Sequence, residues 1–210
     1  MQKQKKDKKL IIGVTGIFGS GKSTVSGILK SHGLKIIDAD KIAHRYLLPQ
    51  AKTYKKIVDF FGRGILKATN EIDRHKLGKL VFANHRLLKK LNSIMHPKII
   101  REIKTGIKNS KAGLIVLDAP LLLEAGLKKM VDDLIVVIID RDELIRRLIK
   151  KTSLKRSEIL KRIKSQVSQS GKSRFADFII DNSGTVSETR KQVKKVMAKI
   201  KEGSCGKIRD

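Results

Sequence analysis

The feature that most constrains this chain is a glycine-rich motif that lies between an expected strand and an expected helix. Residues 16–23 read Gly-Ile-Phe-Gly-Ser-Gly-Lys-Ser and fit the phosphate-binding pattern G-x-x-x-x-G-K-[ST]. The run before the motif, residues 10–14, is apolar and rich in β-branched residues, and a helical pattern follows from Lys22 to about Ser31. A Gly/Ser linker that matched by chance would lack this context. The motif therefore predicts a loop that binds a nucleoside triphosphate.

The residues of this loop have distinct expected roles. Glycines let successive backbone N–H groups turn toward phosphate oxygens, where a side chain would block the approach. The helix N-terminus adds partial positive charge. Lys22 can reach the β- and γ-phosphates, and the hydroxyl of Ser23 can hold Mg²⁺. The residues expected to bind the nucleotide here are Gly19, Ser20, Gly21, Lys22, Ser23 and Thr24.

Two acidic residues follow the second expected strand, residues 34–37. Asp38 and Asp40 stand at the carboxyl edge of that strand, where ligands bind in open α/β sheets. One of them could orient or deprotonate an acceptor hydroxyl. Equally, Asp40 could cap the helical pattern that begins at Lys41, and the spacing alone does not choose. Asp118 ends a later strand and could be either an acid near magnesium or a turn-former.

A strongly basic stretch occupies residues 141–174. A helix pair with several arginines can fold over a bound nucleotide, clamp its phosphates and exclude water. A solvated basic face is the alternative for any single residue, but the group, opposite a phosphate-binding loop, favours a lid. The cations of this stretch include Arg141, Arg146, Arg147, Lys150, Lys151, Lys155, Arg156, Arg162 and Lys172.

The order of expected elements predicts an α/β fold with a P-loop core, in which helices wrap a parallel sheet. Further strands are expected at residues 113–118, 134–139 and 178–180. The run at 134–139 is apolar throughout, as in a strand that is covered on both faces. Helical periodicity dominates between the second and third strands, and His96-Pro97 marks a break between two helices.

The charge balance predicts polyanionic partners. The chain has 48 lysines and arginines against 20 acidic residues, a formal charge of +28. Nucleic acid and phosphorylated small molecules are both candidates, and a lysine-rich composition bias is an equal alternative because the lysines are spread along the chain. A nucleic-acid reader more often shows a reading helix, a metal finger or an aromatic platform, and none is recognisable here. We therefore do not expect nucleic acid as a partner.

Cysteine, histidine and hydropathy patterns exclude several further classes. The single cysteine rules out an intramolecular disulfide and a cysteine-based metal site, and the five histidines lack ligand spacing. No apolar run approaches the ~20 residues that span a bilayer, so we expect no membrane insertion. The chain begins with a polar, basic segment that lacks the apolar stretch of a secretory signal. We therefore expect a cytoplasmic protein.

Taken in order, the segments of the chain resemble the dephospho-CoA kinase family from Leu10 to Val196. A P-loop alone is shared with many unrelated enzymes, whereas the ordered set of landmarks is far more specific. These landmarks are Val14-Thr15-Gly16 with Gly19-Ser20-Gly21-Lys22-Ser23-Thr24, Ile37-Asp38-Ala39-Asp40-Lys41-Ile42-Ala43, Phe60-Phe61-Gly62, Ile72-Asp73-Arg74, His96-Pro97, Asp118-Ala119-Pro120-Leu121-Leu122-Leu123-Glu124-Ala125-Gly126 and Ala176-Asp177-Phe178-Ile179-Ile180-Asp181-Asn182-Ser183-Gly184.

The resemblance implies a kinase that uses ATP and Mg²⁺ to phosphorylate the ribose 3′-hydroxyl of dephospho-CoA. The products would be CoA and ADP, in the last step of coenzyme A biosynthesis. We expect a monomer whose partners are these two small-molecule substrates. The implied parts are a P-loop core (residues 10–45, 112–140 and 175–200), a helical CoA-binding insertion (46–111), a lid (141–174) and basic tails (1–9 and 201–210).

The resemblance also implies roles for individual residues. Asp40 aligns with the catalytic base, and Asp38 lies beside it, near the metal. Arg147 and Arg162 fall where the lid arginines of the family lie, and Asn182 lies near the adenine. The expected catalytic residues are Lys22, Asp38, Asp40 and Arg147. The residues expected on the acceptor side are Arg74, His96, Pro120, Leu121, Leu122 and Glu124.

The chain departs from the family pattern at three places. Ile17-Phe18 stands where the family usually has Gly-Ile, which makes the entrance of the loop bulkier. Lys151 replaces a usual arginine and loses its bidentate fork. Asn70 replaces a usual glycine in a turn, and asparagine tolerates the left-handed conformation.

Two rival functions predict other behaviour. A P-loop kinase for a nucleoside monophosphate or a sugar acid would have no reason to carry these landmarks in this order. A basic NTPase that binds nucleic acid would be stimulated by DNA or RNA and would bind less tightly as salt rises. Such an NTPase also needs a second acid at a strand end, for which the sequence offers only Asp118.

Overall fold

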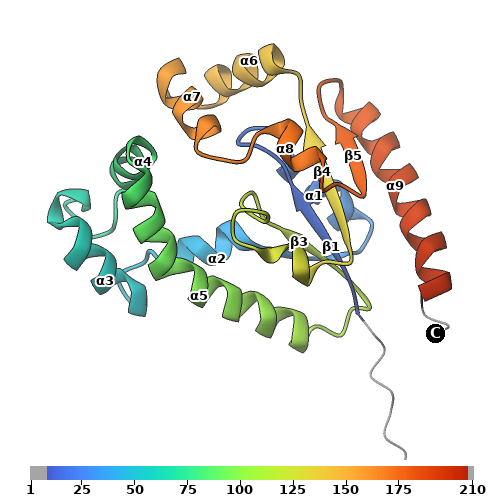
Figure 1. Cartoon of the computed structure of the whole chain (residues 1–210), viewed down its shortest axis with the longest axis horizontal. Helices are drawn as coiled ribbons and strands as arrows, with labels where there is room; N and C mark the ends of the chain where they lie inside the picture. The colour runs from blue at the N-terminus through green and yellow to red at the C-terminus, as the bar shows by residue number, and fades with distance from the viewer. Residues whose placement is uncertain (1–8, 208–210) are drawn as a thin grey trace, which may run out of the picture.

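The computed structural model describes residues 9–207, so the expectations for residues 1–8 and 208–210 lie outside the described residues. Within this range five strands form one sheet in the order β2-β3-β1-β4-β5, and every neighbouring pair is parallel (Figure 1). The strands are β1 (Leu10–Thr15), β2 (Lys35–Asp38), β3 (Leu114–Asp118), β4 (Asp133–Ile138) and β5 (Phe178–Asp181). The expected parallel sheet is confirmed, and strand ends differ from the prediction by at most one residue.

Helices cover both faces of the sheet and extend beyond it. Figure 1 shows α3, α4 and the start of α5 projecting to one side, with α6 and α7 above the sheet. The helices are α1 (Lys22–Ser31), α2 (Ala39–Arg45), α3 (Lys52–Phe61), α4 (Arg74–Ala83), α5 (His85–Asn109), α6 (Arg141–Lys151), α7 (Arg156–Lys164), α8 (Gln169–Ser173) and α9 (Val186–Lys207), with short 3₁₀ turns η1 (Arg63–Ile65) and η2 (Leu127–Met130).

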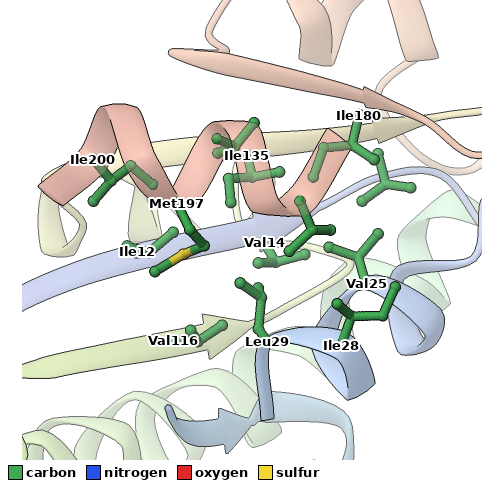
Figure 2. Close-up of a cluster of buried hydrophobic side chains, with 13 residues drawn as sticks. Ile12, Val14, Val25, Ile28, Leu29, Val116, Ile135, Ile180, Met197 and Ile200 are labelled. Atoms are coloured by element: carbon green, nitrogen blue, oxygen red, sulfur yellow. The ribbon is translucent and has the colours of Figure 1, made fainter. Parts of the chain in front are cut away.

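One face of the sheet packs against α1 and α9. Ile12 and Val14 of β1 are fully buried there, because alternate side chains of a strand point to the same face. They meet Leu29 of α1 and Met197 of α9 in the cluster that Figure 2 shows. This packing fixes the start of α1, and with it the phosphate loop, relative to the sheet.

The opposite face packs against α5 and α2. Ile115 and Leu117 of β3 are fully buried on this side, with Ile103 of α5 and Ile42 of α2. Successive side chains of β3 point to opposite faces of the sheet, and helices cover both faces. The central strands are therefore apolar at nearly every position. The position of α2 on this face places its first turn beside the carboxyl end of β2.

Pro97 lies inside α5, so the expected break between two helices at His96-Pro97 is wrong. A proline in a helix interior removes one backbone hydrogen bond and costs about 3 kcal/mol. Burial on both sides outweighs this cost: Met95 packs in the core of the helical insertion, and Ile103 is fully buried against the sheet. Tertiary packing therefore maintains one helix where local propensity predicts two.

Three smaller expectations have clear outcomes. The basic stretch 141–174 contains three helices rather than a pair, because α8 turns back to pack beside β4. Helix α9 continues to Lys207, beyond residue 200, where we expected the C-terminal tail to begin. Asn70 has a positive φ of 60°, which confirms the left-handed turn. Among the helices within residues 9–207, none combines the length and apolarity that crossing a bilayer requires.

Candidate active site

The phosphate loop connects β1 to α1 and depends on three glycines. Gly19 and Gly21 have φ values of 84° and 90°, a conformation that side chains with a Cβ rarely adopt. At Gly16 a Cβ would lie 2.5 Å from the backbone oxygen of Val137. The loop therefore passes so close to β4 that only glycine fits at Gly16.

Asn182 supports this loop from the end of β5. Its side-chain amide donates a hydrogen bond of 3.0 Å to the backbone oxygen of Ser20, and its own oxygen accepts one of 2.9 Å from the Thr189 hydroxyl. Asn182 is buried, and a Cβ added at Gly21 would lie 1.9 Å from its nitrogen. The amide therefore fills the space that Gly21 leaves and holds the loop in position.

Two carboxylates end neighbouring strands beside the loop. Asp38 of β2 and Asp118 of β3 are register partners, and Asp118 is also paired with Val14 of β1. Asp38 Oδ1 accepts a hydrogen bond of 2.9 Å from the backbone N–H of Lys41, so Asp38 is the cap of α2. Asp40 lies in the first turn of that helix. The sequence allows Asp40 to be either a helix cap or a catalytic residue. In the structure Asp38 caps the helix, so Asp40 is not needed as the cap.

Lys22 and these carboxylates shift one another's pKa values. Burial lowers the pKa of Lys22, while the charges of Asp118 and Asp40 act in the opposite direction. Burial raises the pKa of Asp118. Asp40 is accessible to solvent at the mouth of a cavity, but the cavity walls displace part of its hydration, and this desolvation raises its pKa against the opposing charges of Lys22 and Arg74. A carboxylate with a raised pKa binds a proton more readily, so Asp40 is suited to accept one.

The loop and the acids line one cavity of about 430 Å³, which we call the P-loop cavity. Helix α6 forms its far wall through Arg147, Leu148 and Lys151. Nine of the residues expected at the site line this cavity. They are Gly19, Gly21, Lys22, Ser23, Thr24, Asp38, Asp40, Arg147 and Asn182.

A second cavity of about 660 Å³, the insertion cavity, lies between α2, α4, α5 and α7. Arg74 reaches toward His44 with 3.4 Å between Nη1 and Nδ1, and burial lowers the pKa of His44 and of His96. The imidazoles of His44 and His96 give this cavity hydrogen-bonding capacity, and Arg74 and Arg162 give it positive charge. Four residues expected at the site line it, namely Arg74, His96, Leu121 and Arg162.

Helix α2 separates the two cavities. Asp40 in its first turn lines the P-loop cavity, whereas Ala43 and His44, one turn later, line the insertion cavity. The charges of Lys22, which lines the P-loop cavity, and of Arg74, which lines the insertion cavity, both act to lower the pKa of Asp40. A group transferred between ligands in the two cavities would therefore pass beside Asp40.

A sequence model of the dephospho-CoA kinase family matches residues 10–188. The chain belongs to the dephospho-CoA kinase family. A dephospho-CoA kinase of Carboxydothermus hydrogenoformans is 45% identical over 194 residues, which cover 91% of this chain and 94% of that protein. Members of this family are phosphotransferases with an alcohol acceptor, so this chain is a kinase.

Solved structures agree with this assignment. A Thermus thermophilus protein superposes with a TM-score of 0.77 at 30% identity, covering 91% of this chain and 98% of that one. The dephospho-CoA kinase of Campylobacter jejuni superposes with a TM-score of 0.64 at 32% identity, covering 92% and 98%. Each superposition covers more than nine-tenths of both chains.

Arg147 has a different environment from the one expected of a kinase lid arginine. Its guanidinium donates to the backbone oxygens of Asn182, Ser183 and Gly184 at 2.8–3.0 Å, and it also pairs with Glu143. Most of its donors are therefore used to fasten α6 to the loop after β5. Arg147 borders the P-loop cavity, but here it holds the lid in place.

Three residues expected on the acceptor side line neither cavity. Leu122 is fully buried in the sheet core, so its side chain cannot reach a ligand. Both carboxylate oxygens of Glu124 accept from Lys172 at 2.8 and 2.9 Å, and the backbone oxygen of Pro120 accepts from the same ammonium at 2.9 Å. The loop after β3 is thereby tied to α8, and the contact of Pro120 and Glu124 with substrate stays a prediction.

Arg162 also departs from expectation, because it lies in the insertion cavity and not in the cavity of the phosphate loop. One residue that the sequence analysis does not assign lines the insertion cavity, namely His44. Lys172, one of the cations of the basic stretch, is fully buried and lines neither cavity. The helical pattern at Lys41–His44 could have identified His44, since it lies one turn from Asp40.

The residues present fit magnesium. Mg²⁺ prefers oxygen ligands and usually takes one or two carboxylates together with substrate phosphates. The hydroxyl of Ser23 and the carboxylates of Asp38 and Asp118 line the P-loop cavity. Among the described residues, no group of three or more histidines, cysteines and acidic residues could hold a metal ion. Asp38 already uses one carboxylate oxygen to cap α2, while Asp118 interacts with the side chain of Ser26.

Replacing Asn182 by alanine should lower the free energy of unfolding by about 1–3 kcal/mol. The buried oxygen of Ser20 and the hydroxyl of Thr189 would each lose a partner. Urea denaturation measures the loss, and the apparent affinity for ATP should fall with it because the loop loses its support. Thr189→Val is the matched control, since it spares the bond to Ser20. Equal effects of the two variants on ATP affinity would show that Asn182 does not support the loop.

Proposed function

We propose that this chain transfers the γ-phosphoryl group of ATP to the ribose 3′-hydroxyl of dephospho-CoA, giving CoA and ADP. The arrangement of the two cavities on either side of α2 is the observation that carries the proposal. A P-loop cavity suits ATP, and a cationic insertion cavity suits an acceptor that bears phosphate. The names of the relatives support dephospho-CoA as that acceptor.

The residues of the chain divide the chemistry between them. Asp40 accepts the proton of the acceptor hydroxyl, which its raised pKa favours. Lys22 places positive charge beside the phosphoryl oxygens, on which negative charge develops during transfer. Ser23 and Asp118 would hold Mg²⁺, which neutralises phosphate charge when it is bound. Arg147 maintains the lid over the site, which excludes water that would otherwise hydrolyse ATP.

Incubation of the purified protein with ATP, Mg²⁺ and dephospho-CoA should give equimolar CoA and ADP by mass spectrometry. Little ADP should form when dephospho-CoA is omitted. A 3′-deoxy analogue of dephospho-CoA should not react, while the 2′-deoxy analogue should, which tests the position of transfer.

Other outcomes would point to the rivals. Release of ADP on addition of a nucleoside monophosphate or a sugar acid, without CoA formation, would favour another small-molecule kinase. Stimulation by DNA or RNA would favour a nucleic-acid-dependent NTPase. Reaction of the 3′-deoxy analogue would refute the 3′-hydroxyl as the acceptor even if dephospho-CoA is the substrate.

A further inference from the structure

Arg162 lies between two aromatic rings that belong to different parts of the molecule. Its guanidinium carbon is 5.4 Å from the ring centroid of Phe18, in the phosphate loop, and 5.5 Å from that of Phe82, in α4. Arg162 itself belongs to α7 of the lid. A guanidinium stacks well on aromatic faces, and each such contact contributes attraction and fixes the orientation of the plane.

The guanidinium held in this way has donors to spare. Within the described residues Arg162 forms no ion pair and its side chain donates no hydrogen bond. It lines the insertion cavity together with Arg74. Burial lowers the pKa of Arg162, the negative charge of Glu158 opposes this shift, and the positive charge of Arg74 adds to it. Two half-satisfied guanidinium groups that face one cavity form a site for an anion such as a phosphate.

The position of Phe18 is itself fixed by the lid. Its backbone N–H donates a hydrogen bond of 3.0 Å to Oε1 of Gln166, which follows α7. The preceding residue, Ile17, is buried against Leu148 and Ile159 of the lid helices. The phenyl ring is therefore carried by the phosphate loop but held against the lid, where it can orient Arg162.

We propose that Phe18, although it belongs to the phosphate loop, serves the acceptor: with Phe82 it orients Arg162 so that Arg162 and Arg74 bind the diphosphate of dephospho-CoA. This inference rests on the proposed function for the identity of the acceptor. The simpler alternative is that Phe18 only shapes the P-loop cavity, which it also lines. The two differ in which substrate a change at Phe18 affects.

The decisive experiment measures affinity for each substrate by calorimetry and, separately, the KM for each in turnover. Phe18→Leu keeps an apolar side chain but removes the aromatic face, and should weaken dephospho-CoA binding about five-fold. Affinity for ATP should stay within about two-fold. Arg162→Lys keeps the charge without the planar group and should behave similarly, whereas Phe18→Tyr should restore binding. Phe60→Leu is the matched control, because Phe60 is exposed and stacks with Lys90 away from both cavities.

Each outcome decides the matter. Weaker ATP binding by Phe18→Leu with unchanged dephospho-CoA binding would overturn the proposal, as would unchanged dephospho-CoA binding by Arg162→Lys. Wild-type protein that binds dephospho-CoA but forms no CoA would refute the proposed function alone, since calorimetry still reports the effect of Phe18→Leu. Wild-type protein that does not bind dephospho-CoA would refute both.

Discussion

Lys22→Ala should reduce the turnover number about 10³-fold, the largest loss that we expect from a single change. Removing one preorganised donor from a developing charge typically costs 10²–10³ in rate. Lys22 does more than donate, since its charge also compensates the carboxylates of Asp40 and Asp118. The charge of Lys22 opposes the rise in the pKa values of Asp40 and Asp118, so both values would rise further without it. Asp40 would then hold its proton over a wider pH range and would be a poorer base.

Initial rates of CoA formation, measured with both substrates at saturation, test this prediction. Lys55→Ala is the matched control, because Lys55 is exposed on α3 and lines neither the P-loop cavity nor the insertion cavity. The control should keep wild-type rates. A Lys22→Ala variant that retained more than a tenth of wild-type turnover would show that the phosphoryl charge is neutralised mainly by other cations, such as Lys151, which lines the same cavity.

The parts of the fold that could be predicted from the sequence are those that local pattern determines. Short apolar, β-branched runs separated by helical periodicity are sufficient to predict a parallel sheet, and each strand was located within one residue. The sequence predicts a break at Pro97 because the cost of a proline is local, whereas the burial of Met95 and Ile103 that outweighs this cost depends on the folded molecule. A local rule fails wherever distant packing has the larger energy.

The candidate site divides in the same way. The phosphate loop and the Asp-Ala-Asp segment are each short, continuous stretches of sequence, so a local pattern can identify them. The structure brings residues of both into one cavity. The pair of Glu124 and Lys172 is separated by 48 residues, so no local spacing could indicate that Glu124 is already engaged. Leu122 and Arg162 were misplaced for a related reason: which way a side chain faces depends on elements that pack against it later in the chain.

Asp40→Asn should lower the turnover number about 10²-fold or more while leaving the affinity for ATP nearly unchanged. Asparagine keeps the shape and one acceptor oxygen but cannot take up a proton, so the variant loses acid–base help alone. Asp59→Asn is a matched control, since Asp59 is exposed on α3, outside both cavities. If Asp40→Asn kept full turnover and Asp38→Asn lost it, the base would be Asp38.

The pH dependence of the rate tests whether Asp40 accepts a proton or only contributes the shape of its side chain. Desolvation raises the pKa of Asp40 above 3.8, so the carboxylate gains its proton at a higher pH than an ordinary aspartate does. Transfer needs the unprotonated form. The acid limb of kcat/KM should therefore lie above pH 3.8, with activity falling as the pH decreases through the raised pKa. In Asp40→Asn that limb should disappear. A limb that persisted unchanged in the variant would mean that another group, Asp118 first among them, accepts the proton.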